Sequence, residues 1–135
     1  MPLIENDTIF AYLNRLDRNH ETAAKLMRKL GNGEIIVEFS SVALVEMELV
    51  YMSQGLEDRL VEDLATVAAL PGIHVLPLTP DIAVAAAYLR ETHDLSFFDS
   101  HYAATALAGD GAIISFDAAY DTVQGLTRID PTEAT

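Results

Sequence analysis

Carboxylates recur at the expected ends of strands and near the starts of helices. Glu5 and Asp7 follow a short apolar strand, Asp117 follows another, Asp99 lies in the first turn of a helix, and Glu46 lies inside one. In an open parallel sheet, ligands bind in the crevice beyond the carboxyl ends of the strands. We therefore expect these carboxylates to meet in one cleft.

Converging carboxylates repel one another unless cations bind between them. Two cations about 4 Å apart can activate water and stabilise the leaving oxygen in phosphodiester cleavage. The chain has no cysteine, and its four histidines show no metal-ligand spacing. Oxygen ligands of this kind favour Mg²⁺ or Mn²⁺ over zinc.

Each carboxylate also has a purely structural interpretation. Asp7 is placed to cap the next helix, Asp99 has the spacing of a capping box, and Asp117 can start a turn. Asp99 also heads an apolar helical stripe, which leaves it at the edge of the core in need of a partner. Glu46 and Glu48 have equally apolar neighbours, so periodicity does not choose between them.

Short apolar strands alternate with helical periods along the chain, which is typical of βαβ units. The strands are expected at about 3–4, 35–37, 73–78, 112–115 and 127–129. The helices are expected at about 8–16, 21–30, 42–52, 56–67, 80–89 and 96–108. We expect residues 1–135 to form one α/β domain, a three-layer helix-sheet-helix arrangement with a central parallel sheet.

The composition is apolar for a small protein, with 50% hydrophobic residues and a mean hydropathy of +0.20. One helix carries Val42, Val45, Leu49 and Met52 along one face. We expect some apolar surface to be covered by a second copy or by a partner protein.

The formal net charge is −13, from 21 acidic and 8 basic residues, which argues against broad, non-specific nucleic-acid binding. No apolar run approaches the roughly 20 residues that span a bilayer. The first residues lack the pattern of a signal peptide. We expect a cytoplasmic protein without a membrane segment.

Four segments together resemble the PIN-domain family of small nucleases, which includes the VapC-type toxins of toxin–antitoxin pairs. They are 3–13, 41–51, 95–107 and 114–121, in the family's order. The first departs from the pattern, because Glu5-Asn6-Asp7 stands where the family usually has Asp-Thr-Asn. Either Glu5 or Asp7 can then be the first metal ligand, and the shorter Asp7 is slightly favoured.

The resemblance implies a metal-dependent endoribonuclease with a PIN-like fold, typically a homodimer, and it implies an antitoxin protein as a candidate partner. It implies that Mg²⁺ or Mn²⁺ is held by Glu5 or Asp7 together with Glu46, Asp99 and Asp117. It gives supporting roles to Ser115 and Asp121, the latter through an outer water. RNA is the implied substrate.

Two other interpretations remain. The altered first motif is also compatible with a PIN-like interaction module that has weak or no catalytic activity. A receiver-type phosphoacceptor domain likewise gathers aspartates at strand ends, but it needs a lysine near the site. Lys25 and Lys29 both lie in one early helix, which makes that alternative the weaker one.

Overall fold

A five-stranded parallel sheet lies at the centre of the computed structural model, which describes residues 1–134. Its strands are β1 (Leu3–Ile4), β2 (Val37–Ser40), β3 (Ile73–Leu76), β4 (Ala112–Ile114) and β5 (Thr127–Ile129). Their order across the sheet is β3-β2-β1-β4-β5. The predicted α/β class with a central parallel sheet is confirmed.

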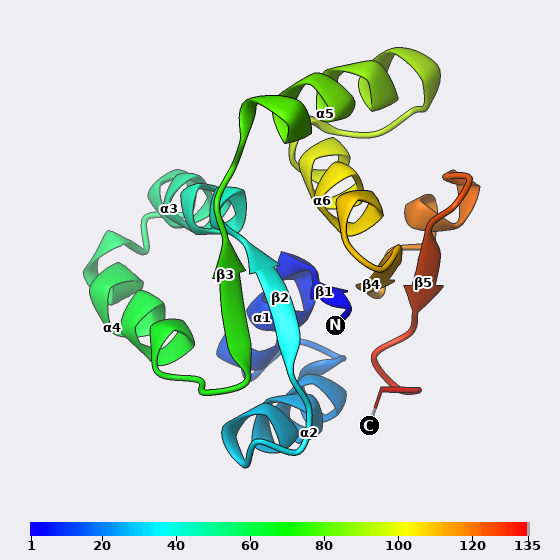
Figure 1. Cartoon of the computed structure of the whole chain (residues 1–135). Helices are drawn as coiled ribbons and strands as arrows, with labels where there is room; N and C mark the ends of the chain where they lie inside the picture. The colour runs from blue at the N-terminus through cyan, green and yellow to red at the C-terminus, as the bar shows by residue number, and fades with distance from the viewer. Residues whose placement is uncertain (135) are drawn as a thin grey trace.

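Helices connect and flank the strands (Figure 1). They are α1 (Asn6–Leu13), α2 (His20–Gly31), α3 (Ser41–Ser53), α4 (Glu57–Ala68), α5 (Pro80–Thr92) and α6 (Phe97–Ala108), with a 3₁₀ helix at Ala118–Thr122. Helix α6 packs against β1, β2 and β4 and is covered by α5, while α1 pairs with α2 and α3 with α4. Within residues 1–134, no helix combines the length and hydropathy needed to cross a membrane.

The neighbouring strands β1 and β4 are deeply buried. Leu3, Ile4, Ile113 and Ile114 are each at most 2% exposed. Leu3 lies opposite Ile113, and Ile4 lies opposite Ile114, so the two strands end at the same level. The segments that follow β1 and β4 therefore begin side by side, at positions that the buried strands hold in place.

The second strand begins later than the sequence predicts. The apolar run at 35–37 favours a strand there, but pairing begins at Val37, and Ile36 is 46% exposed. The register is set by the neighbouring strands, which place Glu38 opposite Leu3. Hydrophobic content alone does not fix such a register.

The apolar stripe predicted on α3 lies mostly at the surface. Val45, Leu49 and Met52 are between 50% and 59% exposed, whereas Met47 and Tyr51 on the other side are buried. The helix is apolar on both sides, so periodicity does not identify the side that faces the core. A surface patch of three apolar side chains results.

Candidate active site

The carboxyl ends of β1 and β4 lie side by side at the point where the strand order reverses. The chain continues from β1 to β2 on one side, while β4 occupies the other side, and ligand crevices open at such points. Glu5 and Asp7 follow β1, and Ser115 and Asp117 follow β4. The topology thus brings together two segments that are more than 100 residues apart.

Ser115 joins these two segments. Its side chain is fully buried, and its hydroxyl oxygen lies 2.7 Å from Asp7 Oδ2 and 3.2 Å from Glu5 Oε2. A hydroxyl has one proton, so it donates to one of these carboxyls at a time. Asp7 Oδ2 also accepts the backbone N–H of Phe116 at 2.8 Å, and Ser115 Oγ accepts that of Asp117 at 3.0 Å.

Glu5, rather than Asp7, caps the first helix. Helix α1 begins at Asn6, and Glu5 Oε1 accepts the backbone N–H of Asp7 at 3.2 Å. The predicted capping role of Asp7 is wrong, because the helix starts two residues earlier than expected. The Asp7 carboxylate instead points toward the end of β4.

The carboxyl groups of Glu5 and Asp7 are buried among other acids. Burial raises the pKa of Glu5 well above its usual value, and the negative charges of Asp7, Asp99 and Glu46 raise it further. Burial also raises the pKa of Asp7, although hydrogen bonds from Ser115 and Phe116 partly oppose this. Of the pair, Glu5 is the residue whose pKa is raised by the charges of Asp99 and Glu46.

Glu46 is held by two buried polar side chains. Asn6 Nδ2 donates to Glu46 Oε1 at 2.9 Å, and the Tyr102 hydroxyl donates to the same oxygen at 2.7 Å. Asn6 Nδ2 also donates to the backbone carbonyl of Ala43 at 2.8 Å, while Asn6 Oδ1 is buried and has no hydrogen-bond partner among residues 1–134. Both of these hydrogen bonds are accepted by Glu46 Oε1, and none within residues 1–134 is accepted by Glu46 Oε2.

Replacing Asn6 with alanine tests this support. Asn6→Ala removes the two hydrogen bonds that Asn6 donates, to Glu46 Oε1 and to the Ala43 carbonyl, so we expect about 1–3 kcal/mol less free energy of unfolding. Urea denaturation measures the change, with Asn32→Ala at an exposed position as control. Equal stability of Asn6→Ala and the unmodified protein would show that Glu46 is positioned without Asn6.

Asp99 and Asp117 complete the group from the other side. Ser96 caps α6 by accepting the Asp99 backbone N–H at 3.2 Å, which leaves the Asp99 carboxylate free to accept the Tyr120 hydroxyl at 3.0 Å. Burial raises the pKa of Asp99, and the charge of Asp117 adds to this. Asp117 itself is exposed and caps the 3₁₀ helix through the backbone N–H of Ala119 at 2.9 Å.

Comparison of the chain with protein families gives a match to the PIN domain over residues 7–126. This covers most of the chain, including the segments that carry Asp7, Glu46, Asp99 and Asp117. The chain belongs to the PIN domain family. Its sequence matches no curated protein.

Solved structures with a similar fold come from toxin–antitoxin systems, at identities that establish the fold alone. A toxin–antitoxin complex from Klebsiella pneumoniae has a TM-score of 0.67 at 17% identity, covering 97% of this chain and 98% of that one. VapBC2 from Rickettsia felis, bound to a promoter DNA fragment, has a TM-score of 0.73 at 11% identity, covering 94% and 96%. VapC20 from Mycobacterium tuberculosis, a sarcin-ricin-loop-cleaving toxin, has a TM-score of 0.72 at 20% identity, covering 87% and 91%.

Asp121 of this PIN domain is linked to the acidic group indirectly, through Arg128. Its carboxylate accepts Arg128 Nε at 3.0 Å and Nη2 at 3.3 Å. Arg128 Nη1 donates to the backbone carbonyl of Ser115 at 3.1 Å. Asp121 is thus connected to Ser115 through an arginine that the sequence pattern did not single out.

The donor set of the PIN domain fits a hard divalent cation in its chemistry. Its carboxylates are close enough to raise the pKa values of Glu5 and Asp99, and a cation between them removes that repulsion. The buried, unpartnered Asn6 Oδ1 is a further oxygen in the same region. In the described part of the chain, however, no three His, Cys, Asp or Glu side chains are yet arranged to hold one ion.

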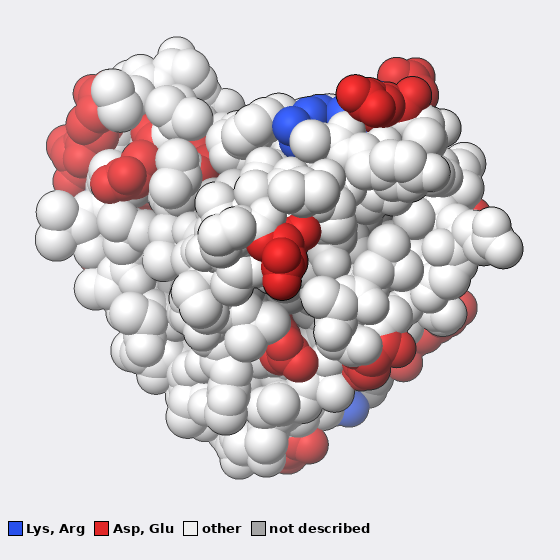
Figure 2. Space-filling model, turned by 45° about the horizontal axis from the view of Figure 1, so that its top comes forward, with Lys and Arg blue, Asp and Glu red and all other residues white. Residues whose placement is uncertain are grey.

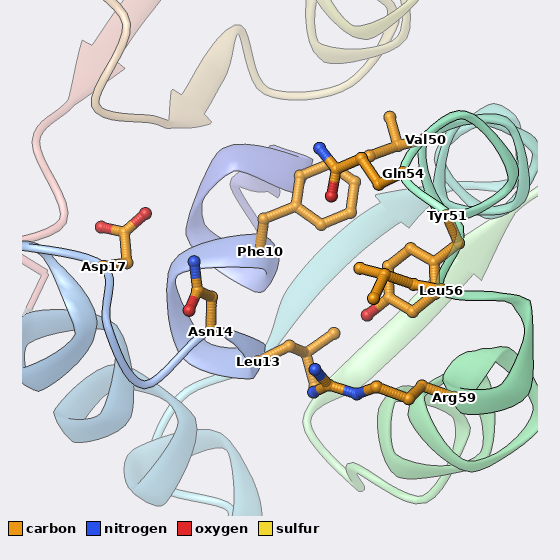
Figure 3. Close-up of a pocket in the computed structure, with 9 residues that line it drawn as sticks. All are labelled: Phe10, Leu13, Asn14, Asp17, Val50, Tyr51, Gln54, Leu56 and Arg59. Carbon is orange, nitrogen blue, oxygen red and sulfur yellow. The ribbon is translucent and has the colours of Figure 1, made fainter.

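A separate pocket of about 290 Å³ lies near the end of α1, where α3 ends and α4 begins. Figure 3 shows Phe10, Leu13 and Leu56 at this pocket, together with Arg59 and Asp17. None of the candidate carboxylates of the PIN site lines it. The acidic group therefore lies outside this pocket.

Acidic groups are spread widely over the surface of the PIN domain. Figure 2 shows red atoms at the centre and the margins of one face, with few blue atoms among them. Five of the eight lysines and arginines fall within residues 15–29. An anionic molecule that approaches the acidic cluster is repelled by this surface. Bound cations and individual arginines are therefore needed to offset the repulsion.

Proposed function

We propose that this chain is a metal-dependent endoribonuclease that hydrolyses RNA phosphodiester bonds and acts as the toxin of a toxin–antitoxin pair. Membership of the PIN family supports a nuclease, and the toxin–antitoxin neighbours in fold support the toxin assignment. The observation that carries the proposal is the group of carboxylates whose charges act on Glu5 at the end of β1. Such a group favours divalent cations and, through them, phosphoryl chemistry.

The side chains of the site have distinct roles in this proposal. Glu5, Glu46, Asp99 and Asp117 would hold Mg²⁺ or Mn²⁺. Asp7 is held by Ser115 and Phe116, and it fixes the end of β4 against the start of α1. The bound cation supplies a Lewis acid that activates water and stabilises charge at the phosphate.

A cleavage assay tests the activity. Purified protein is incubated with structured RNA in Mg²⁺, in Mn²⁺ and in EDTA, and the products are separated by size. We expect discrete products with either metal and none in EDTA. Intact RNA under all three conditions would overturn the nuclease proposal.

A PIN-like interaction module without catalysis is the second candidate. The absence of a preformed three-carboxylate group within residues 1–134 and the glutamate in the first motif favour it. A thermal titration with Mn²⁺ separates the two candidates, because a ligand that binds only the folded state raises the unfolding midpoint. A midpoint that is unchanged by Mn²⁺ would favour the interaction module.

We also propose that the chain forms a homodimer in the cytoplasm and binds an antitoxin protein. The exposed side of α3 supports the dimer, because Val45, Leu49 and Met52 form an apolar patch there. We expect Leu49→Glu to convert the dimer to a monomer in light scattering. Val61→Glu, at an 82% exposed position on α4, is the matched control, and a monomeric unmodified protein would contradict the proposal.

A further inference from the structure

Arg90 and Phe97 form a fixed pair on the side of α6 away from Asp99. The Arg90 guanidinium lies 5.1 Å from the centre of the Phe97 ring, and Arg90 Nη1 donates to Ser100 Oγ at 2.7 Å. Ser100 is fully buried and donates in turn to the Phe97 carbonyl at 2.7 Å. The His101 ring packs 4.8 Å from the Phe97 ring and further restricts it.

The pair remains accessible although its parts are held in place. Phe97 is 55% exposed, and Arg90 is half-buried. A large aromatic side chain at this exposure, fixed beside a planar cation, does not serve to fill the core. Bases of single-stranded RNA stack on aromatic rings and on arginine guanidinium planes in this way.

Arg90 is one of only three basic residues that lie outside residues 15–29 of this acidic chain. Arg59 is paired with Asp63, and Arg128 with Asp121 and Asp130. Arg90 forms no ion pair with any carboxylate in residues 1–134. Its positive charge therefore stays available for a phosphate group, which the surrounding negative surface otherwise repels.

The position of the pair relative to the acidic cluster suggests which part of an RNA it meets. Phe97 and Asp99 both lie in the first turn of α6 but are separated by a little more than half a helical turn. A strand that crosses the start of α6 from the acidic cluster then reaches Phe97. The contacted nucleotide flanks the scissile phosphate rather than containing it.

We propose that Arg90 and Phe97 bind a nucleotide of single-stranded RNA next to the cleavage site, by stacking with its base and pairing with its phosphate. This inference rests on the proposed ribonuclease function and adds residues that determine affinity for the strand. Neither residue touches the reacting phosphate. Their loss weakens RNA binding and leaves the chemical step intact.

The test measures KM and kcat for cleavage of a fluorescein-labelled single-stranded RNA with Mn²⁺, and RNA affinity by anisotropy with Ca²⁺. We expect Phe97→Leu, which keeps the bulk but not the ring, to raise KM and Kd about tenfold with kcat changed less than about twofold. Arg90→Gln has a similar effect and also weakens the salt dependence of binding by about one charge. Phe10→Leu and Arg59→Gln, at the separate pocket near the end of α1, are matched controls.

Each outcome decides the matter. Unchanged KM, Kd and salt dependence in both variants, with cleavage by the unmodified protein, would overturn this proposal and leave the ribonuclease function standing. Loss of the dimer in light scattering of Phe97→Leu would assign Phe97 to a subunit interface instead. An unmodified protein that cleaves structured RNA but neither cleaves nor binds this single-stranded RNA would overturn this proposal alone.

Discussion

Asp117→Asn and Asp99→Asn are each expected to lower RNA cleavage by at least about a hundredfold while leaving the metal-free protein as stable as before, or more so. Changes to residues that only support metal ligands already cost about 10- to 100-fold, and loss of a ligand costs more. Stability is retained because asparagine can still cap the 3₁₀ helix at Asp117 and accept the Tyr120 hydroxyl at Asp99. At Asp99 the substitution also removes a charge whose pKa is raised by burial.

Initial cleavage rates and thermal unfolding of the same samples, without metal, check this expectation. Asp58→Asn, in the exposed first turn of α4, is a matched control that removes one acid away from the cluster. A clear drop in the unfolding midpoint of either site variant would indicate that the carboxylate has a structural role. Retained cleavage in both variants would remove these two residues from the active site.

The sequence predicted which segments meet because strand ends can be recognised from local patterns. Apolar runs followed by Glu5 and Asp117 indicate strand ends, and parallel strands end at one edge of the sheet. The adjacency of β1 and β4 is a property of the whole topology, which no local pattern contains. That adjacency is established by the structure.

Periodicity left the choice between Glu46 and Glu48 open for a physical reason. Their neighbours three and four positions away are equally apolar, so both fit the same helix. The difference comes from Tyr102, 56 residues later, and from Asn6, which hold Glu46 while Glu48 is exposed. Such long-range partners are set by the packing of the helices and strands, so a local sequence pattern does not identify them.

Asn6, Tyr120 and Arg128 were missed for the same reason. Asn6 lies between two acids and looks like a turn residue, yet it is fully buried and contacts α3. Tyr120 contacts Asp99 from within segment 114–121 but has no signal of its own, and Arg128 contacts Ser115 from outside the four segments. An asparagine between two carboxylates at a strand end was the one available signal.

The first motif is expected to bind metal mainly through Glu5, although the sequence alone slightly favours Asp7. Glu5 is the residue on which the charges of Asp99 and Glu46 act, whereas two protein donors occupy Asp7 Oδ2. Glu5→Gln is therefore expected to lower Mn²⁺ affinity by at least about tenfold, and Asp7→Asn by less. Calorimetric titration of both variants with Mn²⁺ measures this directly.

The same assignment predicts how stability depends on pH without metal. Glu5, Asp7 and Asp99 have pKa values raised in the folded state, so between their usual values near 4 and the raised values the folded protein holds protons that the unfolded chain releases. The stability that these three groups contribute is fully present below their usual pKa values. It is lost as the pH rises through the raised values. The unfolding midpoint of the metal-free protein should therefore fall between pH 5 and pH 8.

Glu5→Gln should flatten this fall, because it removes the group whose pKa is raised by burial and by three neighbouring acids. Mn²⁺ should oppose the fall most strongly at pH 8, where the carboxylates need not release protons to bind it. Thermal unfolding of the unmodified protein, Glu5→Gln and Asp7→Asn at both pH values, with and without Mn²⁺, gives the comparison. A steeper dependence in Glu5→Gln than in Asp7→Asn, together with unchanged Mn²⁺ affinity, would make Asp7 the ligand and leave Glu5 as the cap of α1.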